Sequence, residues 1–124
     1  MDVEFPTPDH SDNPEDNLPA WNNCWDVIKD LESKGDDPAF NHVALKHTDK
    51  NIARYKLIPE GGRLPEDKLP PELYRKNFGN TYKRLSRQRP ALTMVPGNDA
   101  FPIHPTLHRS LTVREAARIQ TFPD

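Results

Sequence analysis

Apolar residues recur at helical spacing in some stretches of the chain and at irregular spacing elsewhere. In residues 22–32, Trp25, Ile28 and Leu31 fall three positions apart, which predicts a helix that buries this stripe. A second helix is predicted over residues 49–57, where apolar and polar positions follow the same period. Both stripes contain ordinary core residues, so they indicate structure and carry no chemical signal of their own.

A third helix is predicted near the end of the sequence. Thr112 and Glu115 have the spacing of a capping box, in which each side chain accepts a hydrogen bond from the other residue's backbone N–H. Leu111 precedes the cap and would pack against Ala116 as a hydrophobic staple. Pro123 cannot continue a helix. We expect the helix to bury one face made of Val113, Ala116, Ala117 and Gln120.

The intervening sequence predicts short strands and long loops. Tyr82–Leu85 and Leu92–Val95 are short runs flanked by turn residues, and both are predicted to be strands. A short helix through Tyr74 is expected after a proline-rich stretch, and residues 59–62 and 96–108 are expected to be loops. Together these elements predict a small irregular α+β domain with short strands, few helices and long Pro-rich loops.

The composition of the chain limits the kinds of protein that it can be. With 124 residues, 34% hydrophobic residues and 14 prolines, the chain can form one domain with a modest core, and disorder is an alternative for some segments. Without an apolar run near 18 residues or a signal peptide, we expect neither a membrane span nor secretion. A lone Cys24 is typical of a reducing compartment, so we expect a cytoplasmic location.

The net charge of −2 conceals a strong asymmetry between the two ends of the chain. Residues 1–40 hold eleven Asp and Glu against two Lys, and residues 41–124 hold fifteen Lys and Arg against eight acids. A basic majority of the chain suits a phosphate-bearing partner, although ordinary solvated charge is an equally good interpretation. The densest basic stretch is residues 82–89, whose cations are Lys83, Arg84, Arg87 and Arg89.

These four cations are the candidates for contact with duplex DNA. Such side chains bind phosphates, and arginine can also read guanine in the major groove. On a strand, Arg84 would point away from Lys83, whereas Arg87 and Arg89 would share a face. The alternative is a solvated or salt-bridged strand edge.

Metal binding and nucleophilic catalysis are weaker interpretations. His104 and His108 are four positions apart, but Pro102 and Pro105 disfavour a helix through them, and no glutamate lies between them. Cys24 follows two asparagines at the start of a predicted amphipathic helix, where a small apolar side chain serves equally well. We therefore expect no metal site, and a structural cysteine.

Several motifs along the chain together resemble the DNA (cytosine-5) methyltransferases. The stretch LTVREAARIQTFPD at Leu111–Asp124 is similar to the motif that follows the target-recognition region in this family. Further similar stretches are Val3–Pro8 (VEFPTP), Cys24–Leu31 (CWDVIKDL), Asn41–His42, Arg54–Gly62, Leu69–Pro70, Tyr82–Leu85 (YKRL), Pro90–Thr93 (PALT), His104–Pro105 and His108–Arg109. The resemblance thus covers nearly the whole chain.

The family's catalytic motifs are missing from this sequence. It has no cofactor loop of the Phe-x-Gly-x-Gly type, no Pro-Cys-Gln nucleophile motif and no Glu-Asn-Val motif. In the family these motifs bind S-adenosylmethionine, attack a flipped cytosine and engage its ring, so the resemblance implies that this chain has neither cofactor nor catalytic residues. S-adenosylmethionine is expected only for the complete enzyme.

The resemblance also divides the chain and assigns residues. It implies an extended connector at 1–20, a target-recognition domain at 21–108 and an anchoring helix at 109–124. Thr93 corresponds to a threonine near the DNA backbone at the flipped base. The residues that organise the base of the recognition domain would be Thr112, Arg114, Glu115 and Arg118.

The resulting hypothesis is a fragment or subunit that recognises duplex DNA for a bacterial-type cytosine-5 methyltransferase and is inactive as an isolated chain. Its partners would be DNA and a catalytic domain, in the same or another chain. A second hypothesis is a non-catalytic interaction module that docks a catalytic chain and has little DNA affinity, which the acidic residues 1–40 favour because they repel phosphate. A third is a degenerate remnant without function.

Overall fold

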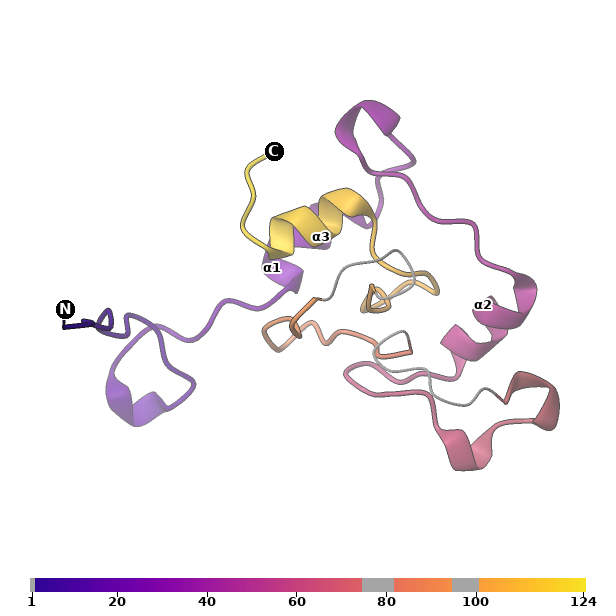
Figure 1. Ribbon diagram of the computed structural model, residues 1–124, viewed down its shortest axis with the longest axis horizontal. Helices are drawn as coiled ribbons and strands as arrows, with labels where there is room; N and C mark the ends of the chain where they lie inside the picture. The colour runs from indigo at the N-terminus through magenta and orange to yellow at the C-terminus, as the bar shows by residue number, and fades with distance from the viewer. Residues whose placement is uncertain (1, 75–81, 95–100) are drawn as a thin grey trace.

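The computed structural model describes residues 2–74, 82–94 and 101–124. In these ranges the regular structure comprises three α-helices, α1 at Trp25–Ile28, α2 at Asp49–Lys56 and α3 at Val113–Ile119. One short 3-10 helix precedes them, at Pro14–Asp16, and four lie between them, at Lys29–Leu31, Pro38–Phe40, Glu66–Lys68 and Pro71–Leu73. Figure 1 shows α1 and α3 lying against each other, with α2 at the opposite side of the central loops.

The first two predicted helices are confirmed, with different degrees of regularity. The stretch predicted at 22–32 begins as α1 and continues as the 3-10 turn Lys29–Leu31, and it buries Ile28 and Leu31. At its start, Asn23 and Asp26 exchange side-chain-to-backbone hydrogen bonds of 3.1 Å each, which resemble a capping box. The helix predicted at 49–57 is α2, which Thr48 caps by accepting from the Asn51 N–H.

Strand pairing in the described ranges consists of isolated bridges. Arg63 pairs with Lys83 in the antiparallel sense, and Ile103 pairs with both Arg84 and Ser110. The predicted strand Tyr82–Leu85 therefore takes part in pairing through single residues. The described part of the second predicted strand, residues 92–94, has no bridge, and Val95 and the first part of the loop predicted at 96–108 (residues 96–100) lie outside the described residues. The α+β class stays a prediction.

Two apolar clusters form the core. One gathers around α2 and the bridged segments and contains Tyr55, Ile58, Leu64, Tyr82 and Ile103. The other lies between α1 and α3 and contains Cys24, Ile28, Leu85 and Leu111. Because Tyr82 and Leu85 belong to different clusters, the short segment between them joins the two halves of the core.

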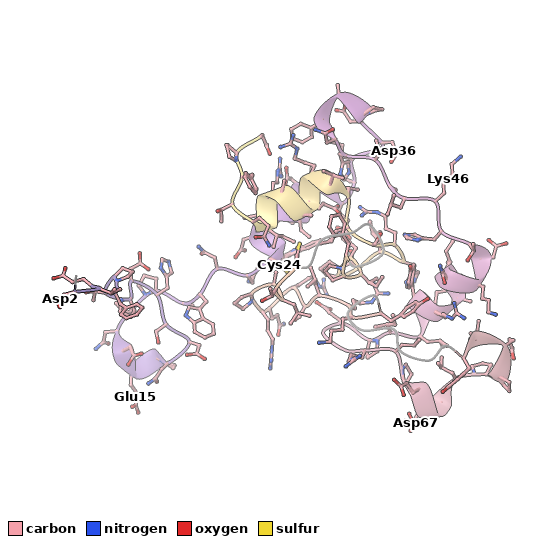
Figure 2. All side chains as sticks on the ribbon, viewed as in Figure 1. Asp2, Glu15, Cys24, Asp36, Lys46 and Asp67 are labelled. Carbon is pink, nitrogen blue, oxygen red and sulfur yellow. The ribbon has the colours of Figure 1, made fainter. Side chains whose placement is uncertain are left out.

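Residues 2–23 extend away from this core as an arm (Figure 1). Its apolar side chains are largely solvent-accessible: Val3 is 73% exposed, Phe5 86% and Trp21 51%. Figure 2 shows Asp2 and Glu15 on the arm, whereas Cys24 lies where the chain enters the core. The extended connector expected at 1–20 corresponds to most of this arm. Within the described ranges, no helix has the length and apolar character needed to cross a bilayer.

The capping box of α3 is confirmed. Thr112 Oγ1 accepts from the Glu115 N–H at 3.2 Å, and Glu115 Oε2 accepts from the Thr112 N–H at 2.9 Å. The helix ends before Pro123: Thr121 takes the left-handed conformation (φ 65°), and the N–H groups of Thr121 and Phe122 donate to the carbonyls of Arg118 and Ala117. This pair of bonds is a Schellman motif.

The expected buried face of α3 is only partly right. Ala116 is buried, but Val113 is 58% exposed and Gln120 is also exposed. The buried positions are instead Thr112, Glu115 and Ala116, and Ile119 packs against the adjacent cluster. The helix is rotated from the expected face because it buries a glutamate, which a search for apolar residues does not count.

Glu115 is fully buried and is paired with Arg109. Arg109 donates two hydrogen bonds of 2.8 Å to the two carboxylate oxygens. Burial alone would raise the pKa of Glu115, but the hydrogen bonds and charge of Arg109 outweigh that effect and lower the pKa. The carboxylate is thus held ionised inside the protein while it caps α3.

His104 lies next to the same carboxylate. Its Nδ1 accepts from the backbone N–H groups of Thr106 and Leu107 at 3.2 and 3.1 Å, which leaves the proton on Nε2. Nε2 is 3.7 Å from Glu115 Oε1, too far for a hydrogen bond, and has no other partner among the described residues. Burial lowers the pKa of His104 to about 4, with the Glu115 charge opposing this shift, so the ring is neutral at pH 7.

Replacing Glu115 tests this buried pair. The capping box alone predicts a loss of about 1 kcal/mol for Glu115→Ala, but the variant also leaves Arg109 without its buried partner, so we expect about 3 kcal/mol. Val113→Ala, a change at an exposed position of the same helix, should alter the free energy of unfolding by less than about 0.5 kcal/mol. Urea denaturation measures both, and equal losses in the two variants would refute the buried pair.

Acid should destabilise the fold through His104. In the unfolded chain the pKa of this histidine is 6.5, and in the folded protein it is about 4. At a pH between these two values the unfolded state therefore binds more protons than the folded state. Stability is therefore complete above pH 6.5 and should fall by about 3 kcal/mol as the pH approaches 4. In His104→Gln this part of the pH dependence should disappear, while His108 contributes equally to both proteins. If the free energy of unfolding of His104→Gln changed with pH in the same way as that of the unmodified chain, His104 would not be the source of the acid sensitivity.

Candidate nucleic-acid interface

The basic segment, residues 82–89, is held by backbone pairing on both sides. On one side, the Leu64 N–H donates to Tyr82 O and the Arg84 N–H donates to Gly62 O, at 3.1 and 2.9 Å. On the other, Ile103 donates to Lys83 O and accepts from the Leu85 N–H, at 2.8 and 3.0 Å. The backbone of Tyr82–Leu85, which carries Lys83 and Arg84, is thus fixed between two neighbours by isolated bridges.

The four predicted DNA-contacting cations occupy different environments. Arg84 is 5% exposed, Lys83 is half-buried, and Arg87 and Arg89 are exposed. The expectation that Arg84 points away from Lys83 agrees with this difference. The cations that face solvent are therefore Lys83, Arg87 and Arg89, and their contact with DNA stays a prediction.

Arg84 has a task inside the protein. Its guanidinium donates to the carbonyls of Tyr55 and Ile58 at 2.8 and 2.9 Å, and to those of His104 and Leu107 at 2.6 and 2.8 Å. A further contact of 3.1 Å joins it to His108 Nδ1. These partners occupy the guanidinium within the core, so the sequence prediction that it touches DNA finds no support in its position.

Arg87 forms the exposed ion pair of the segment. Its Nε and Nη2 donate to the two oxygens of Glu60 at 3.0 and 3.2 Å, and its backbone N–H donates to the same carboxylate at 2.8 Å. These hydrogen bonds lower the pKa of Glu60 and raise that of Arg87. Gly61, at φ +74°, makes the turn that places Glu60 beside the segment, as expected for a glycine in this loop.

Lys83 is paired across the backbone with another cation. The antiparallel bridge places Lys83 directly opposite Arg63. Opposed residues of an antiparallel pair have neighbouring side chains, and like charges there repel each other.

Arg89 and Thr93 lie at the border of a cleft of about 480 Å³ between α1 and the end of α3. Thr93 lines the cleft, and the Arg89 carbonyl accepts from the Cys24 N–H at 3.2 Å, next to it. The remaining lining residues are Asn22, Asn23, Cys24, Val27, Pro90, Ala91, Leu92, Met94, Arg118, Ile119, Gln120 and Thr121. Thr93 is exposed and therefore accessible to a ligand, but its predicted contact with DNA is not established by this position.

The two arginines of α3 hold neighbouring segments. Arg114 donates from Nε to the Phe40 carbonyl at 2.8 Å and lies over the Phe40 ring, 4.4 Å from its centroid. Arg118 binds Asp30 through both carboxylate oxygens and binds Asp124 as well, and this lowers the pKa of each carboxyl group. With Thr112 and Glu115 in the capping box, all four residues named as structural make intramolecular contacts.

Sequence reasoning missed the partners of these side chains. Phe40, Asp30 and Arg109 received no role, although each contacts a motif residue. Asp30 and Phe40 are separated from α3 by more than seventy positions, so local spacing holds no signal for them. Arg109 is six residues before Glu115, and only the burial of that glutamate identifies it as a partner.

Metal and thiol chemistry gain no support from the geometry. Among the residues that the structure describes, no three His, Cys, Asp or Glu side chains are grouped so as to hold a metal ion. Cys24 is buried, and its Sγ–H donates to the Ser86 carbonyl at 3.1 Å. Burial raises the pKa of this thiol, which disfavours the reactive thiolate.

Comparison with known proteins gives consistent matches. The sequence profile of the family described as C-5 cytosine-specific DNA methylase matches residues 4–124. The type II methyltransferase M.NgoFVII of Neisseria gonorrhoeae is 31% identical over 127 residues, which cover 100% of this chain and 33% of that protein. M.AquIB of Picosynechococcus sp. is 36% identical over 83 residues, 67% of this chain and 55% of that protein. No solved structure matches significantly.

The extent of these matches is itself informative. M.DdeI of Desulfomicrobium norvegicum, another type II methyltransferase, is 31% identical over 100 residues, which cover 73% of this chain but 24% of that protein. The chain thus spans from about a quarter to about half the length of these curated relatives. Since the family profile matches nearly every residue, from Glu4 to Asp124, the chain belongs to the C-5 cytosine-specific DNA methylase family.

Proposed function

We propose that this chain is the DNA target-recognition part of a cytosine-5 methyltransferase. The observation that carries the proposal is the basic segment: Lys83 is half-buried on a stretch, Tyr82–Leu85, whose backbone is fixed between two neighbours, and the exposed Arg87 and Arg89 follow it directly. Phosphate contacts set the orientation of a protein on DNA, and a fixed backbone lets them do so reproducibly. Family membership supplies the substrate class, duplex DNA.

Catalysis would take place outside these residues. The sequence lacks the Pro-Cys-Gln, Glu-Asn-Val and Phe-x-Gly-x-Gly motifs, and Cys24 is a buried structural thiol. A catalytic domain, in the same protein or on another chain, would bind S-adenosylmethionine and transfer the methyl group to C5 of cytosine. The target base must leave the stacked duplex for this reaction, so a recognition domain that holds the flanking DNA contributes directly to it.

One relative supports a separate recognition chain. Because 83 aligned residues make up 55% of M.AquIB, that methyltransferase chain is itself only about 150 residues long. M.NgoFVII, by the same reasoning, is about 385 residues long. The family therefore includes both long chains and a chain of nearly the present length, which makes a split enzyme a concrete form of the proposal.

A docking module without DNA affinity is the second candidate. The exposed arm favours it, because residues 2–23 carry acids and apolar side chains such as Phe5 and Trp21 but neither lysine nor arginine. Such a surface repels phosphate and suits a protein partner. In this alternative the arm and the end of α3 would contact the catalytic chain, and the basic segment would remain solvated.

The salt dependence of DNA binding separates the two candidates. If Arg87 contacts a phosphate, Arg87→Ala should lower the affinity for a mixed-sequence duplex and reduce the slope of log affinity against log salt by about 0.9. Glu60→Gln, which frees Arg87, should raise the affinity. Fluorescence anisotropy over a salt series measures both effects.

Lys29→Ala is the matched control, since Lys29 is an exposed cation next to α1 that is outside the basic segment. It should leave the slope unchanged. Equal slopes for Arg87→Ala and the unmodified chain would remove Arg87 from the interface, and no binding by the unmodified chain would favour the docking module.

The isolated chain should not methylate DNA. We expect no transfer of tritium from labelled S-adenosylmethionine to mixed-sequence duplex DNA by the purified 124-residue protein, because the sequence lacks the residues for nucleophilic attack and cofactor binding. A complete cytosine-5 methyltransferase assayed on the same DNA is the positive control. Incorporation that rises in proportion to the amount of the 124-residue protein would overturn this expectation.

A further inference from the structure

Arg84 is a buried cation that backbone carbonyl groups stabilise. Its guanidinium is bound by carbonyl oxygens and one imidazole nitrogen, and in the described ranges no carboxylate lies within ion-pair distance of it. Removing this charge from water lowers the pKa of the guanidinium. A charge placed in the core at such a cost requires several fixed acceptors, and the structure supplies four carbonyl groups.

These acceptors come from two parts of the chain that flank the basic segment. Tyr55 O belongs to the last turn of α2 and Ile58 O follows that helix, so Arg84 binds at the negative end of the helix dipole. His104 O and Leu107 O belong to the loop that leads to α3. A single side chain thus joins the end of α2 to that loop.

Because of the position of Arg84 in the basic segment, the guanidinium contacts also affect how that segment is held. Arg84 follows Lys83 directly, and its own N–H is bonded to Gly62 O. The same alignment of the backbone allows two further hydrogen bonds. The Ile103 N–H donates to Lys83 O, and the Leu85 N–H donates to Ile103 O. Weakening the guanidinium contacts would release the end of α2 and the loop together, and with them both neighbours of the segment.

We propose that Arg84 is a positioning residue for DNA binding: it holds the two flanks that orient Lys83 and Arg87, and it does not itself contact the nucleic acid. The proposal rests on the DNA-recognition function given above. It differs from a direct phosphate contact, which would place Arg84 at the protein surface, and from a purely structural role, which would affect folding and leave the interface unchanged.

Lysine is the informative replacement. Arg84→Lys keeps the charge, but an ammonium group has three donors at one point and cannot reach four carbonyls as a planar guanidinium does. We expect the folded variant to bind a fluorescein-labelled mixed-sequence duplex about tenfold more weakly, with an unchanged salt slope, because the number of phosphate contacts is the same. Arg87→Ala, by comparison, should reduce the slope.

A core variant controls for lost stability. Leu31 lies in the 3-10 turn after α1, outside the basic segment in the sequence, and Leu31→Ala is expected to lower the melting temperature. Binding is measured well below both melting temperatures. If Arg84→Lys and Leu31→Ala both keep the unmodified affinity, Arg84 is only structural and the proposal fails. If Arg84→Lys loses salt slope, Arg84 contacts phosphate and the proposal also fails.

Chemical rescue provides a second measurement. Arg84→Ala removes the side chain, and added guanidinium chloride at low concentration should restore part of the DNA affinity, whereas ammonium chloride at equal ionic strength should not. Equal responses to the two salts would contradict the proposal.

Amide hydrogen exchange separates failure of this proposal from failure of the DNA-recognition function. The Arg87 N–H, bonded to Glu60, should exchange faster in Arg84→Lys than in the unmodified chain. If the unmodified chain does not bind DNA, the recognition function fails, and the claim of a DNA-positioning role fails with it. Faster exchange would still show that Arg84 orders the segment, whereas unchanged exchange would also refute that claim.

Discussion

The buried carboxylate of Glu115 is the interaction on which the end of this structure depends. One side chain completes the cap of α3, pairs with Arg109 and faces the neutral ring of His104. A carboxylate without a partner at this depth would be very costly, so the pair with Arg109 is a condition for burying the helix start at all. The His104 N–H also donates to the Arg109 carbonyl at 2.9 Å, and this bond closes the loop before α3.

Local chemistry made part of this fold predictable. The capping box needs only residues three positions apart, and α2 follows from a periodic stripe with a threonine cap, so both could be recognised in the sequence. The buried face of α3 could not be recognised, because it contains Glu115, whose partner Arg109 is identified only in the three-dimensional structure. The bridges of Ile103 join it to Arg84 and, across a loop, to Ser110, and single bridges leave almost no periodic pattern.

The basic segment shows the same limit for the candidate site. A run of cations looks uniform in sequence, yet Arg84 is buried in the core and the other three cations, Lys83, Arg87 and Arg89, are not. Alternation did contain a signal: positions two apart on an extended backbone share a face, and Tyr82 is a natural core residue, so Arg84 should be buried with it. Composition gave solvation and phosphate contact equal weight for every arginine, so it did not separate Arg84 from the other cations.

Thr121 fixes the direction in which the chain leaves α3. A β-branched residue in the left-handed region is strained, and glycine would be the usual choice. The turn directs the last residues back along the helix, where Asp124 meets Arg118 and Arg114. The exit direction is therefore maintained by ion pairs at the surface against a backbone preference, and ionic strength could adjust it without any change in the core.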